Sequence, residues 1–72
     1  MTDTDITNAE RAKRCEAALE CYNDEWDLLA NLIDFLADAR HWCDREGKCY
    51  GDLDGLAHRH YLAEVEQERR KP

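Results

Sequence analysis

LLANLIDFLADARHWCD, residues 28–44, is the stretch that decides the fold. Its apolar residues recur at intervals of three and four, which is the period of an α-helix, and neither glycine nor proline interrupts it. Its apolar arc covers about half of the helix circumference, so more than one neighbouring helix must cover it. The stretch therefore predicts a helix within an all-α fold.

The same period extends toward the N-terminus. Thr7 and Glu10 form a capping-box pattern, which marks a helix start, and the apolar phase crosses Asn23-Asp24 without a slip. We therefore expect one long amphipathic helix over about residues 8–45. The alternative is a break at residues 23–24, with Asp24 as the N-cap of a second helix. The stripe expected as dimer seam or core is Ala12, Cys15, Leu19, Tyr22, Trp26, Leu29, Ile33 and Leu36.

All three glycines of the chain lie between residues 47 and 55. Gly47 ends the long apolar run, with Arg45 in the last turn, where a cation complements the helix dipole. A shorter C-terminal helix is expected over about residues 50–67. The 72 residues form a single domain with flexible ends at residues 1–6 and 68–72. The expected architecture is a helical hairpin or a three-helix bundle, and a homodimer, because the long helix outreaches the C-terminal one.

The charge balance limits the partners. The chain holds 17 acidic and 10 basic residues, a net charge of −7. Nucleic-acid phosphates and anionic membranes repel such a protein, so we expect neither as a direct partner. A basic protein surface is the natural partner. The N-terminus lacks the features of a secretory signal, and no apolar run approaches the ~18–20 residues of a membrane span. We therefore expect a cytoplasmic protein with free thiols.

Nothing in the sequence points to catalysis or to a metal. The chain has no serine, no glycine-rich phosphate loop and too few residues for a substrate cavity beside a core. No C-x-x-C pair occurs, and His41 and Cys43 point about 200° apart on a helix. We therefore expect a non-enzyme that needs neither cofactor nor metal. A zinc site that combines Cys43 and Cys49 with a C-terminal histidine is the less favoured alternative.

One face of the expected long helix is acidic. Between residues 20 and 46 there are eight acids and two bases. Carboxylates about 5–6 Å apart along a helix have a spacing similar to that of nucleic-acid phosphates and suit a basic surface. The alternative is a face that only solubilises the helix. The expected partner-binding residues are Glu20, Asp24, Asp27, Asp34, Asp38 and, at the edge of the apolar arc, Trp42; Asn31 fills the remaining step of the strip.

Residues 28–44, followed by Gly47, Tyr50 and Ala57…His60-Tyr61…Glu64, resemble small helical proteins of bacteriophages and mobile elements. The resemblance covers about half of the chain, and Gly51 and Gly55 depart from its pattern. It implies an origin and no activity, although small acidic proteins from that source are often inhibitors of host defence, including anti-CRISPR proteins.

The expected function is that of a non-enzymatic accessory protein in the host cytoplasm. It binds a bacterial protein. The most specific form of this expectation is an anti-defence inhibitor that occupies a basic nucleic-acid-binding surface of that protein. The alternatives are a structural or regulatory helical partner with a merely solubilising acidic face, and a small zinc-binding module.

Overall fold

The computed structural model describes residues 6–23 and 27–70, and the regular secondary structure within these ranges is entirely helical. The helices are α1 (Asn8–Tyr22), α2 (Leu28–Arg45) and α3 (Tyr50–Arg69). The all-α prediction is therefore confirmed. The prediction of one continuous helix over residues 8–45 is wrong, because α1 ends at Tyr22 and Asn23 is extended.

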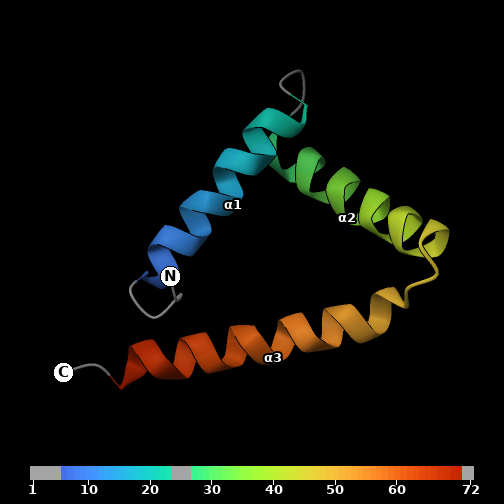
Figure 1. The fold of residues 1–72 in the computed structure, drawn as a ribbon. Helices are drawn as coiled ribbons and strands as arrows, with labels where there is room; N and C mark the ends of the chain where they lie inside the picture. The colour runs from blue at the N-terminus through green and yellow to red at the C-terminus, as the bar shows by residue number, and fades with distance from the viewer. Residues whose placement is uncertain (1–5, 24–26, 71–72) are drawn as a thin grey trace.

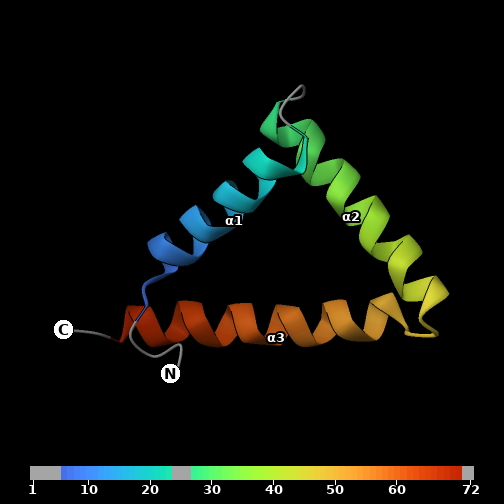
Figure 2. The same cartoon turned by 45° about the horizontal axis from the view of Figure 1, so that its top comes forward.

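The three helices lie along the sides of an open triangle, as two views show (Figures 1 and 2). Helices α1 and α2 meet near the chain connection, α2 and α3 meet at the next turn, and the N-terminal end of α1 lies near the C-terminal end of α3. The molecule measures 41 × 30 × 22 Å along its principal axes. The three-helix alternative is thus the one adopted, and the two-helix hairpin is not.

Side-chain caps explain where α1 and α2 begin. The Thr7 hydroxyl accepts a hydrogen bond from the Glu10 backbone N–H, and Glu10 Oε1 accepts one from the Thr7 N–H, which confirms the capping box. The N-cap of α2 is Asp27, whose Oδ1 accepts from the Ala30 N–H at 2.7 Å. Asp24, the N-cap in the alternative with a break at residues 23–24, lies outside the described residues.

A left-handed glycine ends α2. Gly47 has φ +69°, a conformation that disfavours any side chain. The Lys48 N–H donates to the Cys43 carbonyl at 2.8 Å and the Gly47 N–H donates to the Asp44 carbonyl at 3.4 Å, which together make a Schellman motif. Helix α3 then begins at Tyr50, as predicted, and extends past the predicted end at Gln67 to Arg69.

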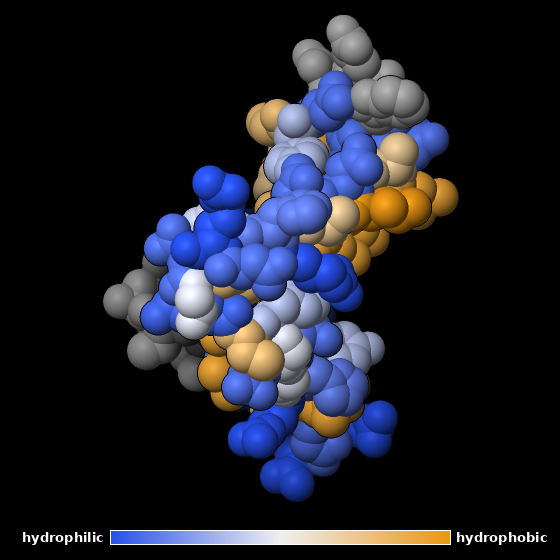
Figure 3. Space-filling view, turned by 90° about the vertical axis from the view of Figure 1, so that its right-hand side faces the viewer, coloured by the Kyte–Doolittle hydropathy of each residue, from blue (hydrophilic) through white to orange (hydrophobic). Residues whose placement is uncertain are grey.

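The described part of the chain has almost no interior. Only Asn31 and Cys43 are buried, with exposed fractions of 1% and 3%. Figure 3 shows hydrophobic side chains gathered at the surface near the corner between α1 and α2. The large hydrophobic side chains that remain exposed are Tyr22, Leu29, Leu32, Ile33, Phe35, Leu36, Trp42, Leu53, Leu56, Tyr61 and Leu62.

The predicted apolar stripe is therefore not a core of this chain. Ala12 and Cys15 are exposed, Leu19 is half-buried, and Trp26 lies outside the described residues. Leu29 and Ile33 are the most exposed of the large hydrophobic side chains within the described ranges. The break after Tyr22 separates the two halves of the stripe, so it does not form one continuous seam.

Candidate functional site

Asn31 fixes the corner between α1 and α2. Its Nδ2 donates to the Leu19 carbonyl at 2.8 Å and to the Asn23 carbonyl at 2.7 Å. The Leu19 carbonyl is one of the last four of α1, which find no partner within the helix itself. Asn31 therefore caps the C-terminal end of α1 from within α2, and its two hydrogen bonds tie the two helices together at this corner.

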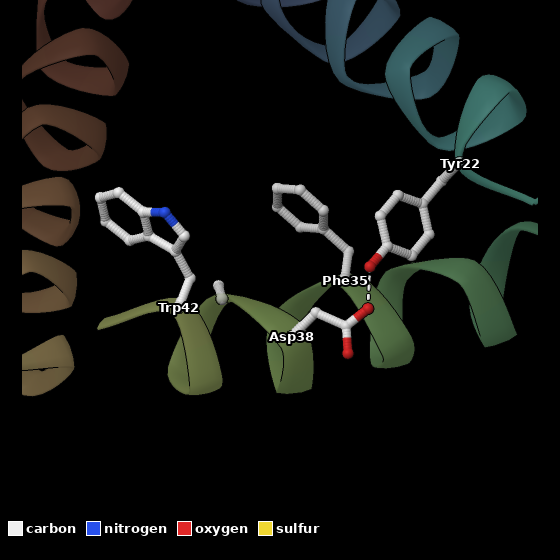
Figure 4. A pocket seen from close by; sticks show the side chains of 5 residues that line it. Tyr22, Phe35, Asp38 and Trp42 are labelled. Carbon is white, nitrogen blue, oxygen red and sulfur yellow. Dashed lines mark hydrogen bonds between the residues drawn. The ribbon is translucent and has the colours of Figure 1, made fainter. Parts of the chain in front are cut away.

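Next to this corner, aromatic side chains from both helices form an open hollow of about 330 Å³. Its lining residues are Tyr22, Phe35, Asp38, Ala39 and Trp42, which we call the aromatic hollow. Figure 4 shows Tyr22 reaching across from α1 and the Phe35 and Trp42 rings standing on the same side of α2. The edge of the Tyr22 ring meets the Phe35 ring, with centroids 5.5 Å apart at 87°.

A carboxylate closes one edge of the hollow. The Tyr22 hydroxyl donates a hydrogen bond to the Asp38 carboxylate (Figure 4). This bond is the main reason that the pKa of the Tyr22 phenol is raised above its ordinary value; partial desolvation and the charges of Asp38 and Asp34 also raise it. The aromatic hollow therefore combines apolar rings with two neighbouring negative charges.

The expected strip of carboxylates does not exist as one solvated face. Glu20 belongs to α1, a different helix from Asp34 and Asp38, and Asp27 serves as the α2 cap. Asn31, expected to fill a solvent-facing step, is buried because α1 packs against this side of α2.

Three of the predicted partner-binding residues lie at or near the aromatic hollow. Asp38 and Trp42 both line the aromatic hollow, and Asp34 lies near enough to act on the Tyr22 phenol. The sequence predicted Tyr22 on the stripe expected as dimer seam or core, and Phe35 only as one of the apolar residues of the stretch 28–44. It did not predict their part in this site. The spacing of Phe35, Asp38 and Trp42 was a signal for one shared face, but nothing in the sequence brought Tyr22 to it.

Polar contacts close the remaining corner of the triangle, between α1 and α3. The Asn8 backbone N–H donates to Glu68 Oε2 at 3.0 Å, and Asn8 Nδ2 donates to the Glu64 carbonyl at 3.1 Å. Arg11 Nε pairs with Glu64 Oε2 at 3.3 Å. Glu68 was expected in a flexible end, whereas it lies within α3 and its carboxylate accepts at the first turn of α1.

The cysteines and histidines do not converge. Within residues 6–23 and 27–70, no three His, Cys, Asp or Glu side chains are grouped so that they could hold a metal ion. All four cysteines are free thiols; Cys43 is buried, whereas Cys15, Cys21 and Cys49 are exposed. None of the helices in these ranges combines the length and the apolar character needed to cross a membrane.

No family model, curated protein or solved structure matches this chain. The resemblance to bacteriophage proteins is thus neither supported nor contradicted by known proteins, and it stays a prediction. The functional argument therefore rests on the geometry of the aromatic hollow.

Proposed function

We propose that this chain is a non-enzymatic binding protein that receives an arginine or lysine side chain of a partner protein in the aromatic hollow. The observation that carries the proposal is the exposure of Trp42 (58%) and Phe35 (47%) beside the Asp38 carboxylate. A cation gains from both an aromatic face and a carboxylate. Tryptophan is also among the residues that dominate binding energy at protein interfaces.

The chemistry favours arginine in particular. A guanidinium stacks on aromatic rings and pairs with a carboxylate through a planar fork of donors. Within the chain, the Arg40 guanidinium already lies 4.2 Å from the centroid of the Tyr50 ring. The net charge of −7 adds a long-range attraction for a basic partner.

A narrower proposal is that the partner is a bacterial defence protein, whose basic nucleic-acid-binding surface is occupied by a phage-derived inhibitor. What supports it is the resemblance of residues 28–64 and the net charge of −7. The competing function is a structural or regulatory partner, in which Asp34 and Asp38 serve only solubility. Salt separates these functions, because charge pairing weakens with ionic strength and apolar docking does not.

The experiment begins with affinity capture from a bacterial lysate and identification of the partner by mass spectrometry. The purified partner is then titrated with the parent, with Trp42→Ala and with the double variant Asp34→Asn/Asp38→Asn. We expect Trp42→Ala to weaken binding by about 30-fold or more, as truncation of a hot-spot residue does. The double variant should weaken binding and flatten its dependence on salt.

Tyr61→Ala is the matched control, since the Tyr61 ring is as exposed as that of Trp42 (58%) but lies on α3. It should bind like the parent. If Trp42→Ala binds the partner with the same affinity as Tyr61→Ala, the partner contact lies elsewhere and the aromatic hollow is not the binding site. An affinity independent of salt in the parent would instead favour the structural partner.

A further inference from the structure

A second hollow lies between α1 and α2 and has a volume of about 450 Å³. Its apolar walls include Leu19 of α1 and Leu32, Phe35 and Leu36 of α2, and we call it the α1–α2 hollow. Its volume falls within the range of about 300–1,000 Å³ that is usual for small-molecule sites. Of the residues that line the aromatic hollow, only Phe35 also lines this one.

The two ends of the α1–α2 hollow differ in chemical character. Helices α1 and α2 converge toward the chain connection (Figures 1 and 2). Leu19 and Leu32 lie at this corner, since Asn31, the neighbour of Leu32, donates to the Leu19 carbonyl at 2.8 Å. Arg11 lies eight residues before Leu19, which is about 12 Å further from the corner along α1. The hollow is therefore apolar at the corner and basic toward the open end of the angle.

The charge of this lining is opposite to that of the chain as a whole. The guanidinium groups of Arg11 and Arg14 line the hollow, and no carboxylate of the described residues does. Arg11 pairs with Glu64 at 3.3 Å, whereas Arg14 has no ion-pair partner within residues 6–23 and 27–70. An unpaired cation at the edge of an apolar space suits a ligand with an anionic head and an aliphatic tail.

We infer that the α1–α2 hollow binds a medium-chain fatty acid, whose carboxylate pairs with Arg14 and whose chain packs against Leu19, Leu32 and Leu36. A guanidinium and a carboxylate pair through two parallel hydrogen bonds, and each methylene group removed from water adds to the affinity. The net charge of −7 opposes the approach of an anion. Physiological salt screens this repulsion beyond about 8 Å, so the adjacent guanidinium dominates at the hollow.

This site is independent of the proposed function, because the residues and the ligand charge both differ. The aromatic hollow receives a cation beside Asp38, whereas the α1–α2 hollow receives an anion beside Arg14. Trp42→Ala should leave the affinity for the fatty acid unchanged, and Arg14→Gln should leave binding of the basic partner protein unchanged. Failure of either proposal is therefore visible without the other.

The test is a titration of the isotope-labelled full chain with decanoate below its micellar concentration, followed by the chemical shifts of the backbone amides. Decanoate has a chain of about the length of two helical turns. We expect saturable shifts gathered at residues 14–19 and 32–36. Decanamide keeps the chain but lacks the charge, so it should bind about tenfold more weakly. Equal affinity for the two probes, or shifts spread evenly over all three helices, overturns the inference.

One pair of variants tests the binding of the carboxylate. Arg14→Gln should raise the dissociation constant of decanoate about tenfold, to a value close to that of decanamide, because the charge that pairs with the head is gone. Arg59→Gln removes an exposed arginine of α3 and is the matched control, which should bind like the parent. Equal affinities of the two variants overturn the assignment of the head to Arg14.

A second pair of variants tests the location of the chain. Ala18 lines the hollow and is exposed, so Ala18→Trp should fill this space and abolish decanoate binding at unchanged helicity. Ala17 is also exposed but points about 100° away around α1, so Ala17→Trp is the matched control and should bind like the parent. If the two tryptophan variants bind decanoate alike, the α1–α2 hollow is not the site.

Discussion

Asn31 of α2 and Leu19 of α1 are joined by a hydrogen bond of 2.8 Å, from the Asn31 side-chain amide to the Leu19 carbonyl. The same amide reaches the Asn23 carbonyl, so a single buried side chain satisfies two carbonyls where α1 ends. These two bonds tie α2 to the C-terminal end of α1, next to Tyr22, whose hydroxyl donates to Asp38. The most buried side chain at this corner is therefore polar.

Replacing Asn31 tests this contact. Asn31→Ala should lower the free energy of unfolding by about 1–3 kcal/mol, because it removes the two hydrogen bonds that the buried Asn31 amide donates to the Leu19 and Asn23 carbonyls. Urea denaturation followed by circular dichroism, at one fixed protein concentration, measures the change. Asp34→Asn, an exposed change one turn further along α2, should stay within about 0.5 kcal/mol of the parent. Similar stability of the two variants would contradict the capping role.

Alkaline titration tests the contact between Tyr22 and Asp38. The contact raises the phenol pKa above 10.0, so its contribution to stability is complete below pH 10 and is lost as the pH rises through the raised value. Asp38→Asn should lower the pKa of Tyr22 toward 10.0, because the negative acceptor and its charge are gone. Ultraviolet absorbance, with a Tyr22→Phe variant subtracted, follows this single phenol. An unchanged titration midpoint in Asp38→Asn would mean that the contact is not made in solution.

Asp27 is a helix cap, so its replacement should act on folding. Asp27→Ala should destabilise the chain by about 1 kcal/mol, whereas Asp27→Ser, which keeps an acceptor for the Ala30 N–H, should recover most of this loss. Thermal melting of both variants measures the difference. An equal loss in the two variants would show that the charge of Asp27, and not its cap, matters.

The same substitution should have opposite effects at two glycines. An added Cβ meets nothing within 4 Å at either Gly55 or Gly47. Gly55 lies inside α3, so Gly55→Ala should stabilise by about 0.5–1 kcal/mol. Gly47 has φ +69°, so Gly47→Ala should destabilise by about 1–2 kcal/mol. Melting temperatures that move in the same direction for both variants would contradict the assigned backbone conformations.

Much of the local structure was predictable because short-range chemistry encodes it. The capping box of Thr7 and Glu10, the end of α2 before Gly47 and the start of α3 at Tyr50 each depend on residues a few positions apart. The extent of α3 was underestimated because Glu68 accepts from the Asn8 N–H, a partner far away in sequence. Of the candidate site, Asp38 and Trp42 were named from the sequence, whereas Tyr22 and Phe35 were assigned to other roles.

By itself, the amino-acid sequence determined that this chain is helical, since its apolar period and the absence of helix breakers before Gly47 allow little else. Only the tertiary structure decided where the first helix stops. The apolar phase runs unbroken through residues 23–27, so periodicity favoured one helix. A continuous helix would satisfy the Leu19 carbonyl internally, and the Asn31 amide could not then reach it from about three turns, or about 18 Å, away. The end of α1 at Tyr22 therefore goes together with the hydrogen bonds from the Asn31 amide to the Leu19 and Asn23 carbonyls. Both depend on the packing of α2 against α1, which residues close together in the sequence do not encode.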